Sequence, residues 1–443
     1  MGQMGGKAAR RATAAEAAAL VKSGDWVDYG FGLGQPDAFD SALAQRRDEL
    51  ENVKIRAALS LRARQVIEVD REGRHFQWFN WHFSGYDRKQ HDAGLANYIP
   101  MNFGEAPDYY RRFIDPVDVA CVKTCPMDEH GWFNVGPTAA YLKAMTERAR
   151  VVIVETSRAV PYAFGEQVAL HASEVDYVIT GDDAPLPQLA NPPITEIDRK
   201  VAERIIPEIE DGACVQIGIG GMPNAVCAVL KDSGLKNLGI HTEMFVDGMV
   251  DLIESGVVNG SRKNINRGHA VYTFAGGSQR MYSFLDRNAA TQCFPVDYTN
   301  DPSIIARNDC VVAINNTTQI DLQGQAASES DGHRHLTGTG GQLQFVRGAY
   351  ASRGGKAFIC LASTYERKGQ RKSRIVLSLT QGNVVTTPRT DTMYVVTEYG
   401  LVNLKGKSLA ERAKALISIA HPDFREELER DARRVGLIPR RWA

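Results

Sequence analysis

The sequence has no excess of charge of either sign and no long apolar run. Its 52 Lys and Arg residues stand against 53 Asp and Glu residues, for a formal net charge of −1, so no overall field favours nucleic acid or an anionic membrane. No stretch approaches the roughly 18 apolar residues of a membrane-spanning helix, and the opening stretch lacks the apolar core of a secretion signal. We therefore expect a cytoplasmic protein.

The cysteines follow no framework spacing. There are seven of them in a large chain, an odd number that favours reduced thiols over a disulfide scaffold. Cys121 and Cys125 stand four apart, but no second pair or His cluster completes a four-ligand zinc site. We predict no metal site.

Several catalytic motifs are also missing. The chain contains no G-x-S-x-G, H-E-x-x-H or Walker sequence. No motif therefore supports serine hydrolysis, zinc proteolysis or P-loop phosphoryl transfer. What remains is ordinary globular composition, 43% hydrophobic and 24% charged over 443 residues. This length predicts two domains.

The chain repeats itself. The stretch SGDWVDYGFGLGQPDAF, starting at Ser23, resembles DGACVQIGIGGMPNAV, starting at Asp211. In both, an alternating strand-like run meets a glycine loop and then a helix-like segment. Two further pairs follow in the same order: NVKIRAALSL (52–61) with NLGIHTEMFV (237–246), and DYVITGDD (176–183) with MYVVTEYG (393–400).

This repeat predicts the fold class: α/β, with two related open domains that arose by duplication and have mainly parallel sheets. The prolines of DAPLPQLANPPITEI mark the join near 184–198. We expect an N-terminal domain over 1–190 and a C-terminal domain over 191–443.

One charged residue interrupts an apolar stretch of the second half. Residues 240–247 read IHTEMFVD, and aligning Ile55 with Ile240 places Ala58 opposite Glu243. The shared scaffold needs only a small residue there, so the glutamate looks like a catalytic group added to one half. A capping or ion-paired glutamate at a strand end is an equally open interpretation of the repeat alone.

Glycine loops offer backbone donors. The loop from Gly218 to Met222 lacks the last glycine of a dinucleotide fingerprint, but it lets a ligand approach a helix terminus. Gly340 and Gly341 could present N–H groups to a developing oxyanion, and Asn315 could add a side-chain donor. Each of these is also compatible with an ordinary turn.

Five motifs in order resemble a known family. They are GIHTEMFVDGMVDLIESGVVNG, PVDYTNDPSIIARND, INNTTQIDLQGQ, GTGGQLQFVRGA and VVTEYGLVNLKGKSLAERAKALISIAHPDFRE. Together they resemble the acetyl-CoA hydrolase/transferase branch of the family I CoA-transferases over nearly the whole chain. FNWHFSGYDR (79–88) and MNFGEAPDYYRRF (101–113) are similar to members acting on butyryl-, 4-hydroxybutyryl- or propionyl-CoA.

The resemblance implies a role for each candidate residue. Glu243 would be the nucleophile, ionised at neutral pH because the reference pKa of glutamate is about 4.3. Asn315 and the backbone of Gly341 would be oxyanion donors. The predicted CoA contacts are Gly218, Ile219, Gly220, Gly221, Met222, Gly340, Gly341 and Lys356.

The expected function is therefore transfer of CoA between a short-chain acyl-CoA and a carboxylate such as acetate, through a glutamyl-CoA thioester. CoA and acyl-CoA would be substrates, with no tightly bound cofactor. An acyl-CoA hydrolase using the same glutamate and a non-catalytic acyl-CoA-binding protein are the alternatives. The resemblance also implies a homodimer or a higher even oligomer.

Overall fold

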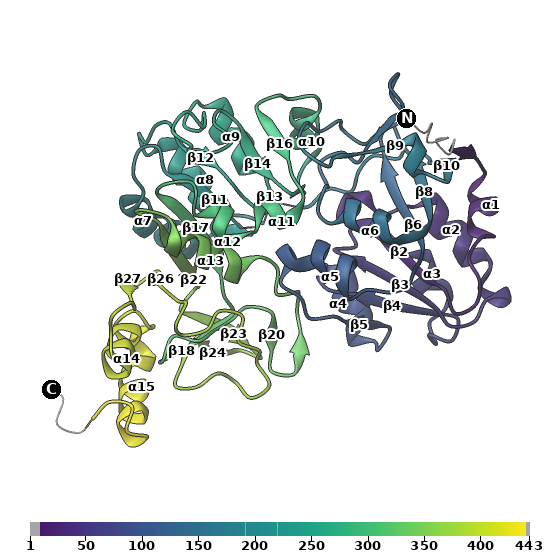
Figure 1. Ribbon diagram of the computed structural model, residues 1–443. Coiled ribbons are helices and arrows are strands. Elements are labelled where there is room, and N and C mark those ends of the chain that lie inside the picture. The colour runs from purple at the N-terminus through teal and green to yellow at the C-terminus, as the bar shows by residue number, and fades with distance from the viewer. Residues whose placement is uncertain (1–8, 191, 219, 440–443) are drawn as a thin grey trace. The chain divides into compact units, whose positions relative to one another are not determined.

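The computed structural model of the chain describes residues 9–190, 192–218 and 220–439. It divides the chain into two units, Met1–Leu189 with Val271–Thr299 and Ala190–Ala270 with Asn300–Ala443. Figure 1 follows both units along the chain. Each unit has its own sheet and its own buried apolar cluster.

An eight-stranded parallel sheet forms the centre of the first unit, in the order β1-β10-β8-β6-β2-β3-β4-β5. Central strands read VDVACVKT and ARVVIVET because a parallel sheet is covered on both faces. The strands are β1 (Arg10–Arg11), β2 (Trp26–Phe31), β3 (Val53–Ala58), β4 (Phe76–Asn80), β5 (Ala96–Tyr98), β6 (Val117–Thr124), β8 (Ala149–Thr156) and β10 (Tyr177–Thr180).

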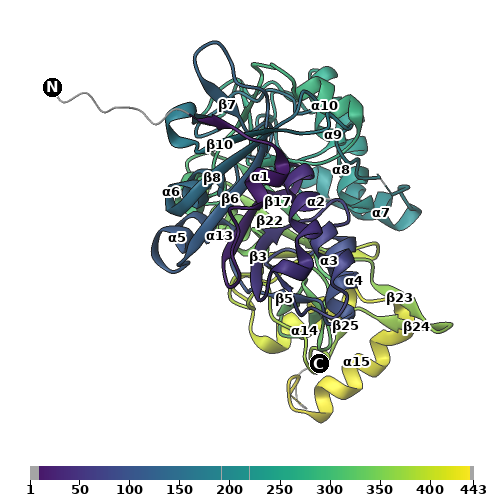
Figure 2. The ribbon, with the colours of Figure 1, turned by 90° about the vertical axis from the view of Figure 1, so that its right-hand side faces the viewer.

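Helices cover both faces of this sheet. Figure 2 shows α2 (Ala38–Gln45) and α3 (Gln65–Val69) on one side, with α5 (Ala106–Arg112) and α6 (Leu142–Arg148) on the other. The other elements up to residue 189 are α1 (Ala14–Ala18), α4 (Gly85–Asp92), β7 (Trp132–Asn134) and β9 (Ala169–His171).

The second unit has a six-stranded sheet in the order β12-β11-β17-β22-β26-β27. Only the last pair is antiparallel. Its strands are β11 (Cys214–Ile217), β12 (Gly239–Ile240), β17 (Val311–Asn316), β22 (Lys356–Cys360), β26 (Tyr394–Thr397) and β27 (Gly400–Asn403). Its helices are α7 (Glu196–Ile205), α8 (Gly221–Asp232), α9 (Asp247–Glu254), α12 (Pro302–Ile305), α13 (Gln342–Ala351), α14 (Leu409–Ser418) and α15 (Pro422–Arg434).

Short strands complete the second half of the chain. They are β13 (Met244–Phe245), β14 (Ala270–Tyr272), β15 (Phe274–Ala275), β16 (Thr291–Cys293), β18 (Gln319–Asp321), β19 (Ala326–Ala327), β20 (Ser330–Asp331), β21 (Arg334–His335), β23 (Thr364–Arg367), β24 (Gln370–Ser373) and β25 (Ile375–Val376).

The duplication is visible in the strand register. The order β10-β8-β6-β2-β3 in the first unit matches β26-β22-β17-β11-β12 in the second. Val27 pairs with Ile55, and Val215 pairs with Ile240, which is the alignment that the sequence repeat predicted. In both units the chain order reverses beside β2 or β11, and such a switch point is where open α/β sheets bind ligands. The predicted α/β fold class is confirmed.

The expected continuous domains, 1–190 and 191–443, need a correction. The segment Val271–Thr299 belongs to the first unit. Its backbone explains why: the N–H of Ala275 bonds the carbonyl of Pro137 at 2.9 Å, and the N–H of Cys293 bonds that of Phe164 at 2.7 Å. It carries α10 (Gln279–Leu285) and α11 (Val296–Thr299).

Across residues 9–190, 192–218 and 220–439, no helix is both long and apolar enough to cross a membrane. No cluster of His, Cys, Asp and Glu in the same ranges could hold a metal ion. All seven cysteines are free thiols.

Candidate active site

Glu243 follows the edge strand β12 at the carboxyl edge of the second unit's sheet. The chain then enters β13 and, two residues later, α9. Thr242 and Phe245 are fully buried, whereas Glu243 keeps some exposed surface. The acid is therefore fixed by buried neighbours while its own side chain remains reachable.

A buried lysine holds the strand that precedes this acid. The ammonium of Lys263 donates to the carbonyl oxygens of Ile240 (2.9 Å) and His269 (2.7 Å). Gly239 leaves room for it, since a Cβ there would lie 2.5 Å from Lys263 Cγ. Burial lowers the pKa of Lys263 to about 8. Ile240 stands three residues before Glu243, so this lysine fixes where the edge strand ends.

Two donors bind the Glu243 carboxylate. Nδ2 of Asn300 donates to Oε2 at 2.6 Å, and the backbone N–H of Gly341 also bonds the carboxylate. Burial raises the pKa of Glu243 to about 7, against the smaller lowering effect of these two bonds. Burial thus favours the protonated form of this acid more than the reference pKa alone suggests.

Gly341 must be a glycine for this contact. A Cβ at 341 would lie 2.2 Å from Glu243 Oε2 and 2.2 Å from Asn300 Nδ2. The preceding Gly340 has a φ of +59°, a left-handed conformation that glycine adopts without strain. Gly341 also caps the ten-residue helix α13, whose N-terminus favours negative charge.

Asn315 lies at the same edge of the sheet but bonds a different residue. It is the penultimate residue of β17, and its Nδ2 donates to Gln216 Oε1 on β11 at 3.1 Å. The structure thus brings Glu243 and Gly341 together and places the Asn315 amide beside Gln216, at the switch point between β11 and β17.

The second glycine loop connects β11 to α8, as predicted. Gly220 has a φ of +126° and precedes the helix, and the N–H of Gly218 bonds the carbonyl of Ile314 at 3.3 Å. Gly221 and Met222 form the first turn of α8. Ile219 lies outside the described residues. The loop therefore presents a helix N-terminus at the carboxyl edge of the sheet.

Lys356 is a correction to the predicted CoA contacts. It is the first residue of β22 and pairs with Val312 near the start of β17. It therefore lies at the amino edge of the parallel sheet, opposite to Asn315. Its ammonium bonds Glu208 Oε2 at 2.8 Å and the Glu208 carbonyl at 3.0 Å. We withdraw Lys356 from the site, because it pairs with a local carboxylate at the wrong edge.

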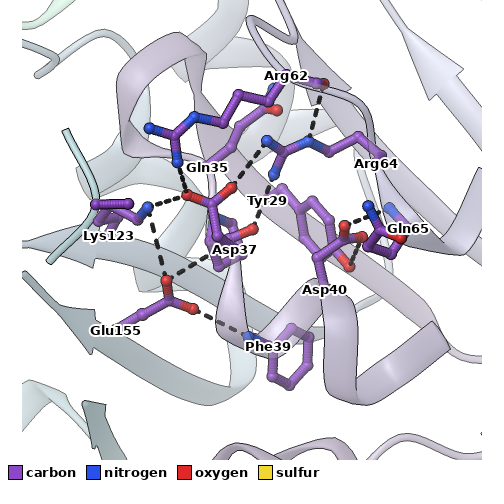
Figure 3. A network of polar contacts seen from close by, with 12 residues as sticks. Tyr29, Gln35, Asp37, Phe39, Asp40, Arg62, Arg64, Gln65, Lys123 and Glu155 are labelled. Atoms are coloured by element: carbon purple, nitrogen blue, oxygen red, sulfur yellow. Dashed lines mark hydrogen bonds and ion pairs between the residues drawn. The ribbon is translucent and has the colours of Figure 1, made fainter. Parts of the chain in front are cut away.

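The matching crevice of the first unit is filled by charged side chains of the chain itself (Figure 3). Glu155, at the end of β8, accepts hydrogen bonds from the N–H groups of Asp37 (2.9 Å) and Phe39 (3.0 Å) at the start of α2. Arg64 pairs with Asp37 at 3.0 Å, and Lys123 pairs with it too. A carboxylate thus occupies the helix terminus where an anionic ligand would bind.

Comparison with known proteins gives the family. Family models for the N-terminal and C-terminal domains of acetyl-CoA hydrolase/transferase match residues 8–190 and 277–432. The chain belongs to the acetyl-CoA hydrolase/transferase family.

Relatives in this family align with nearly the whole chain. The butyryl-CoA:acetate CoA-transferase of Anaerostipes caccae is 45% identical over 428 residues, covering 96% of both chains. The succinyl-CoA:cyclohexane-1-carboxylate CoA transferase of Geobacter metallireducens is 45% identical over 423 residues, 96% of this chain and 95% of the relative. The crystal structure of RipA from Yersinia pestis has a TM-score of 0.88 at 39% identity, covering 97% of this chain and 98% of that one. The predicted CoA-transferase family is confirmed.

Asn300 is the residue of this family member's site that the sequence analysis missed. Its motif, PVDYTNDPSIIARND, carries the family resemblance but gives no separate indication of a role for Asn300. The local signal is a helix start: Asp301 caps α12 by accepting from the N–H of Ser303, and Pro302 takes the first helical position. This helix start accounts for Asp301 and Pro302, but it gives no reason for an asparagine at position 300.

Proposed function

We propose that the protein is an acyl-CoA:carboxylate CoA-transferase whose nucleophile is Glu243. One observation carries the proposal. The Glu243 carboxylate stands at the ligand-binding edge of its sheet, 2.6 Å from the Asn300 amide and bonded by the Gly341 N–H. A carboxylate with neutral donors and, among the described residues, no cationic partner is suited to covalent chemistry, because an ion pair would reduce its nucleophilicity.

The proposed reaction begins when ionised Glu243 attacks the carbonyl carbon of the acyl-CoA thioester. The C–S bond breaks, and CoA leaves as a thiolate with the electron pair, which leaves an acyl-glutamyl anhydride. The thiolate then attacks Cδ of Glu243, releasing the first carboxylic acid and forming a glutamyl-CoA thioester. A second carboxylate reverses these steps and takes the CoA. One thioester is exchanged for another, so the reaction needs no nucleotide.

We assign CoA binding to the loop of Gly218, Gly220, Gly221 and Met222, where the N-terminus of α8 suits a phosphate. Gly340 supports the turn that aims Gly341 at the carboxylate. Asn315 is proposed as the donor to the oxygen of the acyl group, since its amide faces the same edge. CoA and acyl-CoA are substrates in this proposal, and neither a metal nor a tightly bound cofactor is part of it.

The proposed substrates are short-chain acyl-CoA donors, namely butyryl-, 4-hydroxybutyryl- or propionyl-CoA, with acetate as acceptor. Two relatives that are both 45% identical are named for butyryl with acetate and for succinyl with cyclohexane-1-carboxylate. Overall identity therefore does not select the acyl group. A panel of acyl-CoA donors assayed against acetate tests this part of the proposal.

Activity assays distinguish a CoA-transferase from two alternative functions. In an acyl-CoA hydrolase, water would open the glutamyl thioester, so turnover would not depend on added acetate. In a non-catalytic acyl-CoA-binding protein, no acyl exchange would occur. The raised pKa of Glu243 favours catalysis over a structural role, because a structural acid is normally paired or exposed.

We further propose a cytoplasmic homodimer or higher even oligomer. The free thiols suit a reducing compartment. The assembly rests on the family resemblance alone, and light scattering of the purified protein tests it.

Substitution of the nucleophile tests the central claim. Glu243→Ala and Glu243→Gln should abolish transfer while CoA binding and the fold persist. Glu243→Asp should be severely impaired, because the shorter side chain withdraws the carboxylate by roughly 1 Å. Glu254→Gln, at the exposed end of α9, is the matched control and should retain wild-type transfer. Transfer by Glu243→Ala above a few per cent of wild type would refute the assignment.

A further inference from the structure

A cavity in the first unit has no part in the proposed reaction. Its volume is about 310 Å³, within the range of small-molecule sites. It lies where strands β1, β8 and β10 end, beside the segment that follows β6. The residues that line it include Arg11, Met127, Phe133, Thr156, Val178 and Thr180.

The strand register places four of these side chains on one face of the sheet. Arg11 of β1 pairs with Val178 of β10. Two residues further along β10, Thr180 pairs with Thr156 of β8, and each of these threonines is the last residue of its strand. Paired residues on neighbouring strands point to the same face, as do residues two apart on one strand. All four side chains therefore project together at the end of the sheet.

A second wall of the cavity is apolar. It is formed by Phe133, which is buried, and by Met127, which is 52% exposed. The N–H of Cys125 donates to the carbonyl of Asn134 at 2.7 Å. This bond closes the segment that carries both apolar side chains, so the wall is formed before any ligand arrives.

Two hydrogen-bond donors at the cavity have no acceptor in the described part of the chain. They are the guanidinium of Arg11 and the hydroxyl of Thr180. None of the described lining residues is acidic. An arginine presents parallel N–H donors that match the two oxygens of a carboxylate. The cavity thus combines one unpaired cation with an apolar wall.

We propose that this cavity binds a linear monocarboxylate, with its carboxylate on Arg11 and Thr180 and its alkyl chain against Met127 and Phe133. An inorganic anion would leave the apolar wall uncovered, and an uncharged ligand would leave Arg11 unpaired. Such acids are the class that the proposed reaction consumes and releases. The site itself rests on the geometry of the first unit and does not depend on Glu243.

The experiment uses full-length protein with carbon-13 in the methionine methyl groups. The chain has ten methionines, and Met127→Leu identifies the signal of Met127. Titration with hexanoate should shift that signal saturably, with half-saturation at roughly 1 mM. Acetate lacks the apolar chain and 1-hexanol lacks the charge, so each should bind at least about tenfold more weakly.

Variants assign the contacts. Arg11→Gln should weaken hexanoate binding at least about tenfold, because the charged donor is lost. Thr180→Val keeps the shape but loses the hydroxyl, and should weaken binding by roughly two- to tenfold. Arg10→Gln is the matched control, because Arg10 precedes Arg11 in β1 and points to the opposite face of the sheet. It should bind hexanoate as wild type does, and so should Glu243→Gln.

Several outcomes would overturn the site. One is no saturable shift of the Met127 signal in wild type up to roughly 50 mM hexanoate. Equal affinity of wild type and Arg11→Gln, or an equal loss in Arg10→Gln, would remove the role of Arg11. Equal affinity for 1-hexanol would reduce the site to an apolar contact, and equal affinity for acetate would reduce it to an anion contact. Transfer retained by Glu243→Ala would contradict the proposed function alone and leave this site intact.

Discussion

Ionisation of a single residue, Glu243, should set the pH dependence of the reaction. Burial raises its pKa from 4.5 to about 7. The hydrogen bonds from Asn300 and Gly341 lower the pKa only partly, and no charged side chain of the described residues contributes. Only the carboxylate attacks, so kcat/KM for acyl-CoA should rise with pH and reach half its plateau near pH 7. Initial rates between about pH 5 and about pH 9 test this. A profile already flat at the acid end would contradict it.

The same ionisation should make the protein less stable as pH rises. The pKa of Glu243 is higher folded than unfolded, so between pH 4.5 and about 7 the folded state holds the extra proton. Stability therefore falls through this window, by at most ~3 kcal/mol. Glu243→Gln lacks this cost, and its Tm should exceed that of wild type at about pH 8 and approach it at about pH 4.5.

A differential melt of the two proteins at both pH values provides the measurement. The acid end serves as the internal control, because at about pH 4.5 Glu243 is protonated in the folded state and half protonated in the unfolded state, so little of the pH-dependent cost remains. An equal Tm difference at the two pH values would mean that the substitution acts through packing, and the buried charge would not be its cause.

Some residues of the site could be predicted from the sequence and others could not. Glu243 stood out because an acid interrupts a buried stretch and its counterpart in the repeat is Ala58. Asn300 did not, because it lies 57 residues from its partner in the chain and only the tertiary fold brings the two together. Lys356 was misassigned because a lysine after two glycines suggests phosphate, whereas the strand direction sends it to the opposite edge of the sheet.

Among the secondary-structure elements, the packing of α12 on α13 has the most direct consequence for the site. Gly348 lets the helices approach, since a Cβ would lie 2.5 Å from Ile305 Cγ2 and 2.6 Å from Ile305 Cβ. Gly348→Ala must therefore push the helices apart. We expect a loss of stability of roughly 1–3 kcal/mol and reduced kcat, because Asn300 and Gly341 precede these helices.

Chemical denaturation and steady-state kinetics measure the two effects. Gly85→Ala is the control, because Gly85 is also a helical glycine, the first residue of α4, but has nothing within 4 Å of the added Cβ. It should be neutral or slightly stabilising, as alanine favours helix. Equal behaviour of the two variants would show that the close approach at Gly348 is not needed.

At the scale of the whole molecule, the sequence predicted two related α/β halves, and the strand orders of the two units agree with it. Three short matches sufficed because the repeated strands, loops and helices occur in the same sequence order. The assignment of Val271–Thr299 to the first unit could not be predicted. It depends on backbone bonds to residues more than a hundred positions away, and no local pattern encodes such pairing.

The two halves carry different side chains at their switch points, where the chain order reverses at the carboxyl edge of each sheet. The second unit has an acid with two donors at its edge. The first has Ala58 in the corresponding position, and Glu155, Lys123 and Arg64 fill the end of its sheet (Figure 3). Each chain should therefore form one covalent CoA adduct, although it contains two copies of the fold.

Intact mass spectrometry after incubation with acyl-CoA and no acceptor measures that stoichiometry. Wild type should gain the mass of one CoA per chain, and borohydride should reduce the adduct and mark the peptide around IHTEMFVD at Glu243. Double-reciprocal plots for donor and acceptor should be parallel, because the first product leaves before the acceptor binds. Glu254→Gln should give the same single adduct and Glu243→Gln none. A second CoA on the wild-type chain, or an adduct that persists in Glu243→Gln, would place a nucleophile elsewhere and contradict the division of roles between the two halves.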